Sequence, residues 1–407
     1  MIDILKVSLV FVVLLIFLRF KWNVGYVLLI ASALLAALYQ MSFPVMVSTI
    51  KSAVTDPMTV QFFFALTLIR VFEMVLREKH VLARMTESSR SLLRRKKAVI
   101  ISMPLLIGLL PSVGGAYFSA PMVDESTRGL KMTPEEKGFI NYWFRHPWEY
   151  VLPLYPGILL AAAISGLEVR SLILANATYA VLIFATGFLF SMRNIKMINS
   201  AGPVESKESE VQVPSSLRAS GLVSFLPLVM VLLFVVLFQI QLHYSLGITI
   251  LGLFVFYKFG GGEIYRVLKH GFAMEIIVLI FGAMAFKFSM ENSGAVVRLS
   301  RYFTEQGIPL LPVLFALPFV SGLLTGLTVG FVGSTFPLLI SLAGGVHINQ
   351  IAFAFVSGYT GVLLSPVHMC LVLTREYFKA DVWGMYRKML PACGIILGAA
   401  LAGYLVL

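Results

Sequence analysis

The order of apolar and polar positions is the clearest signal in this chain. Long apolar runs alternate with short polar connections, and several runs reach the roughly 20 residues that an α-helix needs to cross a bilayer. A transmembrane β-barrel would show short strands of alternating polarity instead, which the unbroken runs exclude. The pattern predicts an all-α polytopic membrane protein with about 10 transmembrane helices. The predicted spans are 4–18, 23–40, 57–76, 138–166, 170–191, 221–241, 244–259, 271–290, 348–374 and 389–407.

Two further apolar segments, about 98–127 and about 309–343, are too long for one simple span. Each is interrupted near its middle by Gly, Pro and Ser or Thr, in the stretches LLPSVGGAYFSAP and GLLTGLTVGFVGSTFP. Non-helical backbone survives at membrane depth only where protein buries it or it lines a cavity. We therefore expect two re-entrant hairpins.

Composition and charge agree with a membrane protein. Hydrophobic residues make up 58% of the 407 residues, charged residues only 13%, and the mean hydropathy is +0.89. These values exclude a soluble enzyme, a disordered chain, a coiled coil and a nucleic-acid binder. The net charge of +12 fits cytoplasmic loops rich in Lys and Arg. Their distribution predicts a multi-pass protein of the cell (inner) membrane with both termini outside, and Asp3 argues against a cleaved signal.

The two halves of the chain match each other at an offset of about 214 residues, with Gly108 aligned on Gly322. We expect a first inverted repeat in 1–192, a polar cytoplasmic linker in 193–220 and a second repeat in 221–407. Inverted repeats are typical of secondary transporters, whose binding sites lie at the repeat interface near the midplane. The amphipathic segments 77–97 and 291–307 would lie flat at opposite membrane faces.

The two hairpin tips carry the first set of candidate site residues. Bare glycine backbone lets a ligand approach closely, and helix N-termini favour anions. Hydroxyls and loop carbonyls are the ligands expected for Na⁺. The candidates for substrate binding are Ser112, Gly114, Gly115 and Thr328, and those for Na⁺ are Thr325, Gly330, Gly333, Ser334 and Thr335.

Two proline-broken helices, about 138–166 and about 348–374, carry the second set. The first reads FINYWFRHPWEYVLPLYPG, with Asn141, Arg145, His146 and Glu149 inside an apolar span. Asn141, Arg145 and His146 are its candidates for substrate binding. A charge at the bilayer centre costs about 2.5–3.5 kcal/mol on insertion scales. Because of this cost, we interpret the charged residues in this span as candidates for a function. Arg145 and Glu149 are spaced i, i+4 and could instead neutralise each other. His146 and Glu149 are also candidates for proton coupling.

The second broken helix reads FVSGYTGVLLSPVHMC, and we expect it to unwind between Gly358 and Pro366. Tyr359, Thr360 and Ser365 are its candidate substrate ligands, and His368 follows the break. Cys370 and Cys393 form no CxxC pair, and no zinc-binding spacing, P-loop or HExxH motif occurs. We therefore expect no enzyme and no cofactor other than a Na⁺ coupling ion.

The stretches LLPSVGGAYFSAPMVDE and FINYWFRHPWEYVLPLYPGI resemble the domain-of-unknown-function family 401, and the resemblance extends over the whole chain. That family is grouped with the ion-transporter superfamily, which includes divalent-anion/sodium symporters. The resemblance implies an elevator-type transporter and a homodimer. Several relatives carry a Ser-Asn-Thr triplet at both tips, whereas this chain has Ser112-Val113-Gly114-Gly115 and Gly333-Ser334-Thr335.

Together these features predict a cation-coupled transporter, driven by Na⁺ or H⁺, of a small organic anion such as a carboxylate. Arg145 would pair with the anion. The alternative is a Na⁺/H⁺ antiporter or an inorganic-ion efflux protein without organic cargo. The expected partners are a small anionic solute and membrane lipid, and no nucleic acid.

Overall fold

The computed structural model describes residues 2–92, 96–111, 115–192 and 223–406, and these ranges contain helices and no strand. Before residue 193 the helices are α1 (Ile2–Arg19), α2 (Val24–Leu38), α3 (Phe43–Thr55), α4 (Pro57–Glu78), α5 (Val81–Leu92), α6 (Lys96–Ile107), α7 (Gly115–Ser126), α8 (Pro134–Trp143), η1 (Pro147–Tyr150), α9 (Pro156–Ser165), α10 (Val169–Gly187) and η2 (Phe188–Met192). After residue 222 they are α12 (Leu226–Leu232), η3 (Leu233–Leu237), α13 (Leu242–Phe256), α14 (Gly261–Gly271), α15 (Met274–Asn292), α16 (Ala295–Glu305), α17 (Leu310–Thr325), α18 (Thr328–Leu342), α19 (Ile348–Leu363), α20 (Met369–Phe378) and α21 (Val382–Val406).

Four helical stretches in the described ranges are long and apolar enough to cross a membrane: Pro57–Glu78, Val169–Ser191, Gly261–Asn292 and Val382–Val406. Most of the other predicted spans contain shorter apolar helices, such as Val24–Leu38 and Ile348–Leu363. The span 4–18 forms α1. Large apolar side chains also cover the outside, for example Val181 (66% exposed) and Val255 (79% exposed). Water-soluble monomers rarely expose apolar surface on this scale, so the chain is a multi-pass membrane protein.

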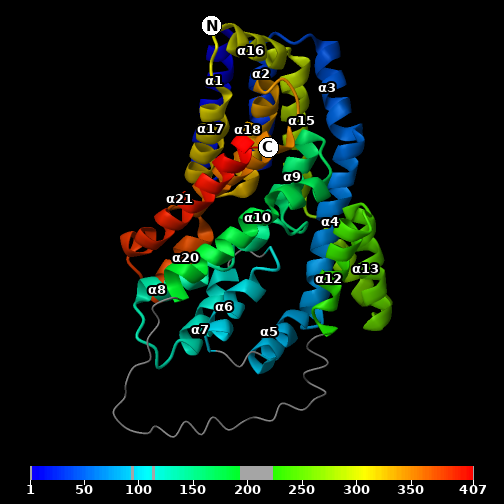
Figure 1. Cartoon of the computed structure of the whole chain (residues 1–407). Coiled ribbons are helices and arrows are strands. Elements are labelled where there is room, and N and C mark those ends of the chain that lie inside the picture. Colours follow the sequence, from blue (N-terminus) through cyan, green and yellow to red (C-terminus); the bar gives the residue numbers. More distant parts are fainter. Residues whose placement is uncertain (1, 93–95, 112–114, 193–222, 407) are drawn as a thin grey trace, which may run out of the picture.

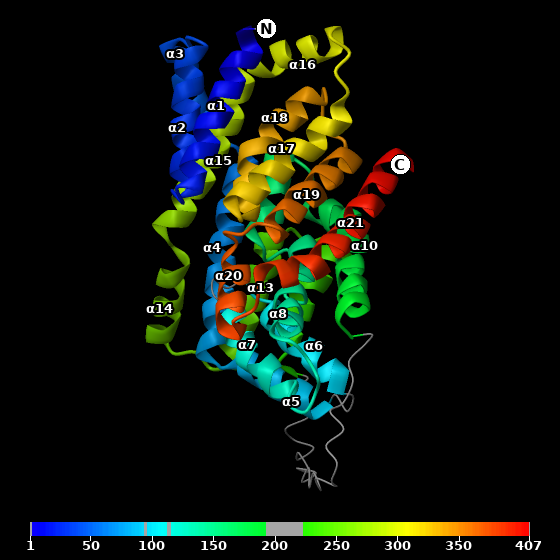
Figure 2. The same ribbon diagram turned by 90° about the vertical axis from the view of Figure 1, so that its left-hand side faces the viewer.

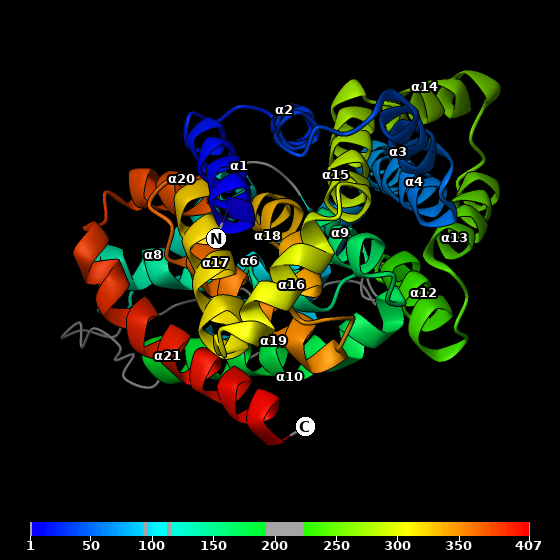
Figure 3. The ribbon, with the colours of Figure 1, turned by 90° about the horizontal axis from the view of Figure 1, so that it is seen from above.

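The helices form two groups that meet along one face. Seen from above, α2, α3, α4 and α13–α15 lie on one side, and α6–α10 with α17–α21 lie on the other (Figure 3). The groups touch where α1 packs on α17, α2 on α18, and α4 on α9.

Helix α3 was not expected from the hydropathy pattern. It continues into α4 across Asp56, whose side chain accepts hydrogen bonds from the backbone N–H groups of Met58 and Thr59.

Two short amphipathic helices lie at opposite ends of the molecule. Helix α16 lies across the end that also holds the start of α1, and α5 lies at the other end beside α6 and α7 (Figures 1 and 2). They fall in the segments 77–97 and 291–307 that the sequence marks as amphipathic. The predicted linker 193–220 lies outside the described residues.

Several helices cross so closely that only glycine fits. A Cβ atom on Gly282 in α15 would lie 2.2 Å from the carbonyl oxygen of Gly25 in α2. Between α17 and α19, a Cβ on Gly361 would lie 2.1 Å from the Phe319 oxygen, and one on Gly322 would lie 2.1 Å from the Gly358 oxygen. Such small-residue contacts are the usual way in which membrane helices approach each other. The contacts at Gly322 and Gly361 hold α17 against α19.

Candidate functional site

Two helix breaks meet in the middle of the second helix group. The first lies between α8 and α9, where Pro147, Pro153 and Pro156 each lack the N–H that a continuous helix requires. The second lies between α19 and α20 at Leu364–His368, around Pro366. We expected the helix to unwind between Gly358 and Pro366, and the break occupies only the end of that range. Helix α19 continues to Leu363, because a glycine inside a helix costs only about 1 kcal/mol whereas proline removes a hydrogen bond.

Tyrosines from each broken helix satisfy carbonyl groups at the other break. The hydroxyl of Tyr142 in α8 donates to the carbonyl of Leu363 at 2.9 Å, and that of Tyr359 in α19 donates to the carbonyl of His146 at 3.2 Å. Both rings are fully buried. The two breaks are therefore joined directly, although 221 and 213 residues separate the partners in sequence.

Removing these hydroxyls should destabilise the junction. Tyr142→Phe leaves Leu363 without its donor, and we expect it to cost about 1–3 kcal/mol, because an unsatisfied buried carbonyl loses its solvation without compensation. Tyr359→Phe should cost less, since the His146 carbonyl also accepts from the Glu149 N–H at 3.4 Å. Thermal unfolding of detergent-purified protein would rank the two. Tyr244→Phe, whose side chain is 60% exposed, serves as the control. Equal losses for all three would contradict this account.

The first break also caps the end of α6. Trp148 donates from Nε1 to the Leu105 carbonyl at 2.7 Å, and the Tyr155 hydroxyl donates to the Gly108 carbonyl. A Cβ on Gly108 would lie 2.4 Å from the carbonyl oxygen of Arg145. The end of α6 thus packs directly on the backbone of Arg145. The predicted residues Ser112 and Gly114 lie outside the described residues, and Gly115 is the first residue of α7.

Arg145 and Glu149 are not paired with each other. The chain leaves the α-helical path after Trp143, so the i, i+4 spacing no longer places their side chains together. Arg145 is only 5% exposed, and its Nε and Nη1 have no hydrogen-bond partner among the described residues. The half-buried Glu149 instead accepts a hydrogen bond from the Thr328 hydroxyl, 2.8 Å from Oε2. Glu149 therefore connects the first break to the start of α18.

The turn between α17 and α18 is short and lies against the second break. It consists of Gly326, with a φ of +64°, and Leu327. A Cβ on Gly326 would lie 2.9 Å from the backbone of His368, and the Gly326 carbonyl is 2.7 Å from His368 Nδ1. The side chain of Thr328 packs on Gly157 of α9. This turn therefore contacts both breaks.

The structure does not bring the candidate Na⁺ ligands together at that turn. Gly330, Gly333, Ser334 and Thr335 lie inside α18, where helical bonding uses their backbone groups. The Thr335 hydroxyl donates to the Phe331 carbonyl, that of Thr325 donates to Ser321, and Ser334 bonds the Ser321 hydroxyl. The prediction of a tip at these residues treats the glycines as helix breakers. Neighbouring helices instead pack on the small residues, so the helix persists.

Two predicted substrate ligands form hydrogen bonds within the protein. Asn141 donates to the Ala116 carbonyl and the Thr374 hydroxyl at 2.9 Å each, and accepts from Ser119 at 2.6 Å. It thus links α7, α8 and α20. Thr360 donates to Val356 within α19. Ser365, by contrast, lies in the second break, where its Oγ accepts from the backbone of Val367 at 3.4 Å.

Two histidines face each other across the two breaks. His146 Nε2 and His368 Nε2 are 3.1 Å apart, and both side chains are buried. The half-buried Cys370 lies beside them, with the three ligand atoms within 4.8 Å of one another. The sequence showed no zinc-binding spacing, because 222 residues separate the two histidines. A signal was nonetheless available: each histidine is adjacent to a proline break, and Cys370 follows His368 by two residues.

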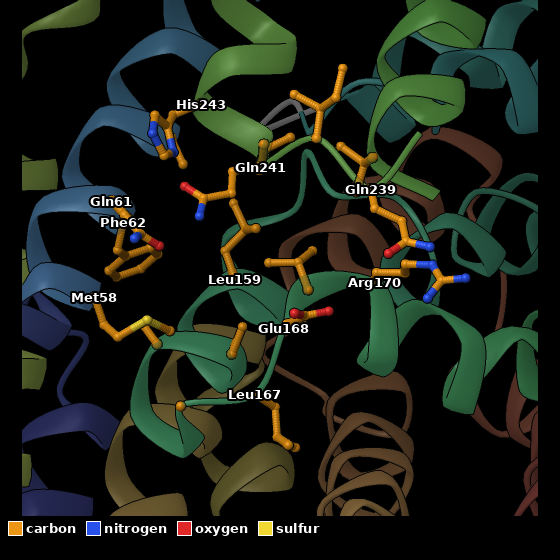
Figure 4. Close-up of a pocket in the computed structure, with 18 residues that line it drawn as sticks. Met58, Gln61, Phe62, Leu159, Leu167, Glu168, Arg170, Gln239, Gln241 and His243 are labelled. Atoms are coloured by element: carbon orange, nitrogen blue, oxygen red, sulfur yellow. The ribbon is translucent and has the colours of Figure 1, made fainter. Parts of the chain in front are cut away.

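A cavity of about 360 Å³ lies away from this centre, and none of the predicted site residues lines it. It is bounded by α4, the α9–α10 connection and the segment before α13 (Figure 4). Its polar lining residues are Gln61, Glu168, Arg170, Gln239, Gln241 and His243. Arg170 donates from Nε to the Val236 carbonyl at 3.0 Å. The cavity lies where the two helix groups meet.

Comparisons with known proteins identify the family and the fold. No curated protein matches the chain. Among solved structures, the chain is similar to the crystal structure of the Alcanivorax borkumensis YdaH transporter, which was described as having an unusual topology. The TM-score is 0.59, the identity is 12%, and the match covers 98% of each chain. At this identity the likeness establishes the fold alone. A family model described as "Protein of unknown function (DUF401)" matches residues 3–407, so the chain belongs to the DUF401 family.

Proposed function

We propose that the protein is an elevator-type secondary transporter that couples the movement of a small organic anion, such as a carboxylate, to a Na⁺ or H⁺ gradient. The fold shared with the YdaH transporter supports a transport function. The proposal includes a homodimer in the inner membrane with both termini on the outer side, and membership of the ion-transporter superfamily.

Arg145 is the observation that carries this proposal. A guanidinium that is 95% buried with two unpartnered nitrogens is costly unless a negative group neutralises it. In the part of the chain that the structure describes, no carboxylate forms an ion pair with Arg145, and Glu149 binds Thr328 instead. A carboxylate solute would supply the missing negative charge and accept charge-assisted hydrogen bonds from these nitrogens. The anion would also lie beside the end of α6, which packs on Arg145.

Glu149 supports cation coupling. Its carboxylate lies between the first break and the start of α18, and its bond to Thr328 would respond to a proton or a Na⁺ ion bound there. The pairs α6–α7 and α17–α18 would be the re-entrant hairpins. The order of elements supports an inverted repeat, since each half contains an amphipathic helix, a helix pair, a broken helix and a last long helix. The positions of α5 and α16 at opposite ends fit this arrangement.

Transport assays in proteoliposomes test the proposal. A panel of mono- and dicarboxylates is offered to the purified protein with an inward Na⁺ gradient, an inward H⁺ gradient, or neither. We expect one carboxylate class to accumulate under one gradient, and the same compound to raise the melting temperature by mass action. No accumulation and no thermal shift with any organic anion would refute organic-anion transport.

A Na⁺/H⁺ antiporter remains the second candidate, because His146 and Glu149 lie in an apolar region while the 360 Å³ cavity lies elsewhere. Proton movement driven by Na⁺ in dye-loaded proteoliposomes, without any organic solute, would favour it. Glu149→Gln should abolish this movement. Thr328→Val, which removes only the hydroxyl donor, should weaken it.

A further inference from the structure

The paired histidines pose an electrostatic problem. Nδ1 of His146 is 2.6 Å from the Tyr142 carbonyl, and Nδ1 of His368 is 2.7 Å from the Gly326 carbonyl. A carbonyl oxygen can only accept, so both Nδ1 atoms must carry the proton. In neutral imidazoles this leaves lone pairs on both Nε2 atoms, and these lie 3.1 Å apart. Two facing lone pairs repel each other unless a cation lies between or beside them.

The geometry fits one metal ion. Zinc–nitrogen bonds of about 2.0–2.1 Å at a tetrahedral angle place two imidazole nitrogens about 3.3 Å apart. The observed 3.1 Å is close to that value. Cys370 Sγ lies within 4.8 Å of a ring nitrogen of each histidine. With a zinc–sulfur bond of about 2.3 Å, Sγ would lie about 3.6 Å from each coordinating nitrogen. A small movement of this half-buried side chain would therefore bring all three ligand atoms to bonding distance.

The outer contacts resemble those that orient metal-bound histidines. Such histidines usually donate their other N–H to a carbonyl or carboxylate, which fixes the ring and directs its lone pair at the ion. Here the carbonyl of Tyr142 holds His146 and that of Gly326 holds His368. Gly326 permits the contact because its φ is +64° and it has no Cβ to meet the His368 backbone.

We propose that His146, His368 and Cys370 form a binding site for a thiophilic transition-metal ion of the Zn²⁺ class. Two imidazoles and a thiolate are a nitrogen–sulfur set, which suits Zn²⁺ or Cu⁺ and not the hard cations Na⁺, Mg²⁺ or Ca²⁺. Binding deprotonates the Cys370 thiol and releases one proton. The ion would join the first break, the second break and the α17–α18 turn. The inference concerns metal binding by the chain and does not depend on which solute it carries.

Metal binding to the full-length, chelator-treated protein in detergent tests the site. We expect one Zn²⁺ per chain by equilibrium dialysis and metal analysis. Co²⁺, which replaces Zn²⁺ in tetrahedral sites, should give a visible ligand-field band and a near-ultraviolet thiolate-to-metal charge-transfer band. Cys370→Ser should remove the charge-transfer band. His368→Ala should weaken metal binding at least about 100-fold. Mutation of a group that only hydrogen-bonds a metal ligand typically weakens metal binding about 10- to 100-fold.

Matched variants control for folding and for unspecific binding. Cys393→Ser changes the other cysteine, which is buried in α21, and His347→Ala changes an exposed histidine at the start of α19. Both should keep the Co²⁺ spectrum and the stoichiometry. If His146→Ala does not give a symmetric size-exclusion peak, the half-buried Cys370→Ser remains informative. Metal that stays bound with the same spectrum in Cys370→Ser and His368→Ala overturns the proposal. If the wild-type protein binds no metal, the proposal is also overturned. The cation between the two imidazole rings is then a shared proton.

Discussion

Replacing Arg145 with alanine is expected to raise the half-saturating concentration of the transported anion about 100-fold, equivalent to about 2.7 kcal/mol. The reason is the loss of charge-assisted hydrogen bonds from a guanidinium that is only 5% exposed. Arg145→Lys keeps the charge but not the planar pair of donors, so it should fall between alanine and the wild type. Concentration-dependent uptake in proteoliposomes gives these values.

A second readout separates a binding arginine from a structural one. Without ligand, the buried and unpaired guanidinium destabilises the fold, so Arg145→Met should raise the melting temperature while abolishing the shift that the anion causes. A structural arginine would lower the melting temperature instead. Arg170→Ala, in the cavity between the helix groups, is the matched variant. If Arg170→Ala raises the half-saturating concentration and Arg145→Ala does not, the anion binds in the cavity.

Replacing Gly361 with alanine is expected to cost more than about 3 kcal/mol, above the usual range for overpacked cores. The added methyl would lie 2.1 Å from the Phe319 carbonyl oxygen and 3.0 Å from the Leu323 nitrogen, and both are backbone atoms that cannot rotate away. Helices α17 and α19 would have to separate, and this would also move the α17–α18 turn away from His368. The yield of monodisperse protein and its melting temperature measure the effect.

Gly398→Ala in α21 provides a control of opposite sign. No atom lies within 4 Å of the added Cβ, and alanine favours a helix over glycine by up to about 1 kcal/mol. This variant should be as stable as the wild type or more so. A melting temperature for Gly361→Ala equal to that of Gly398→Ala would contradict the close crossing of α17 and α19.

The sequence predicted the class of the fold and its two breaks well, because both depend on local chemistry. Apolar runs predict helices in a membrane, and the breaks lie at Pro147 and Pro366. Proline alone does not decide this, because Pro337 lies inside α18. The resemblance to DUF401, drawn from two motifs, is confirmed over the whole chain. Predictions that required distinguishing a glycine that breaks a helix from one that packs against a neighbour were less accurate. Gly358 and Gly330 both proved to be helical.

What the sequence determined by itself is therefore an all-helical membrane protein with a buried arginine beside a proline break. Only the tertiary structure decided which groups meet there. It separated Glu149 from Arg145 by taking the chain off the helical path, and it placed Glu149 on Thr328. It also brought His146 within 3.1 Å of His368. Periodicity and spacing describe neighbours along a helix, whereas these contacts join segments about 180 to 220 residues apart, which depend on how whole helices pack.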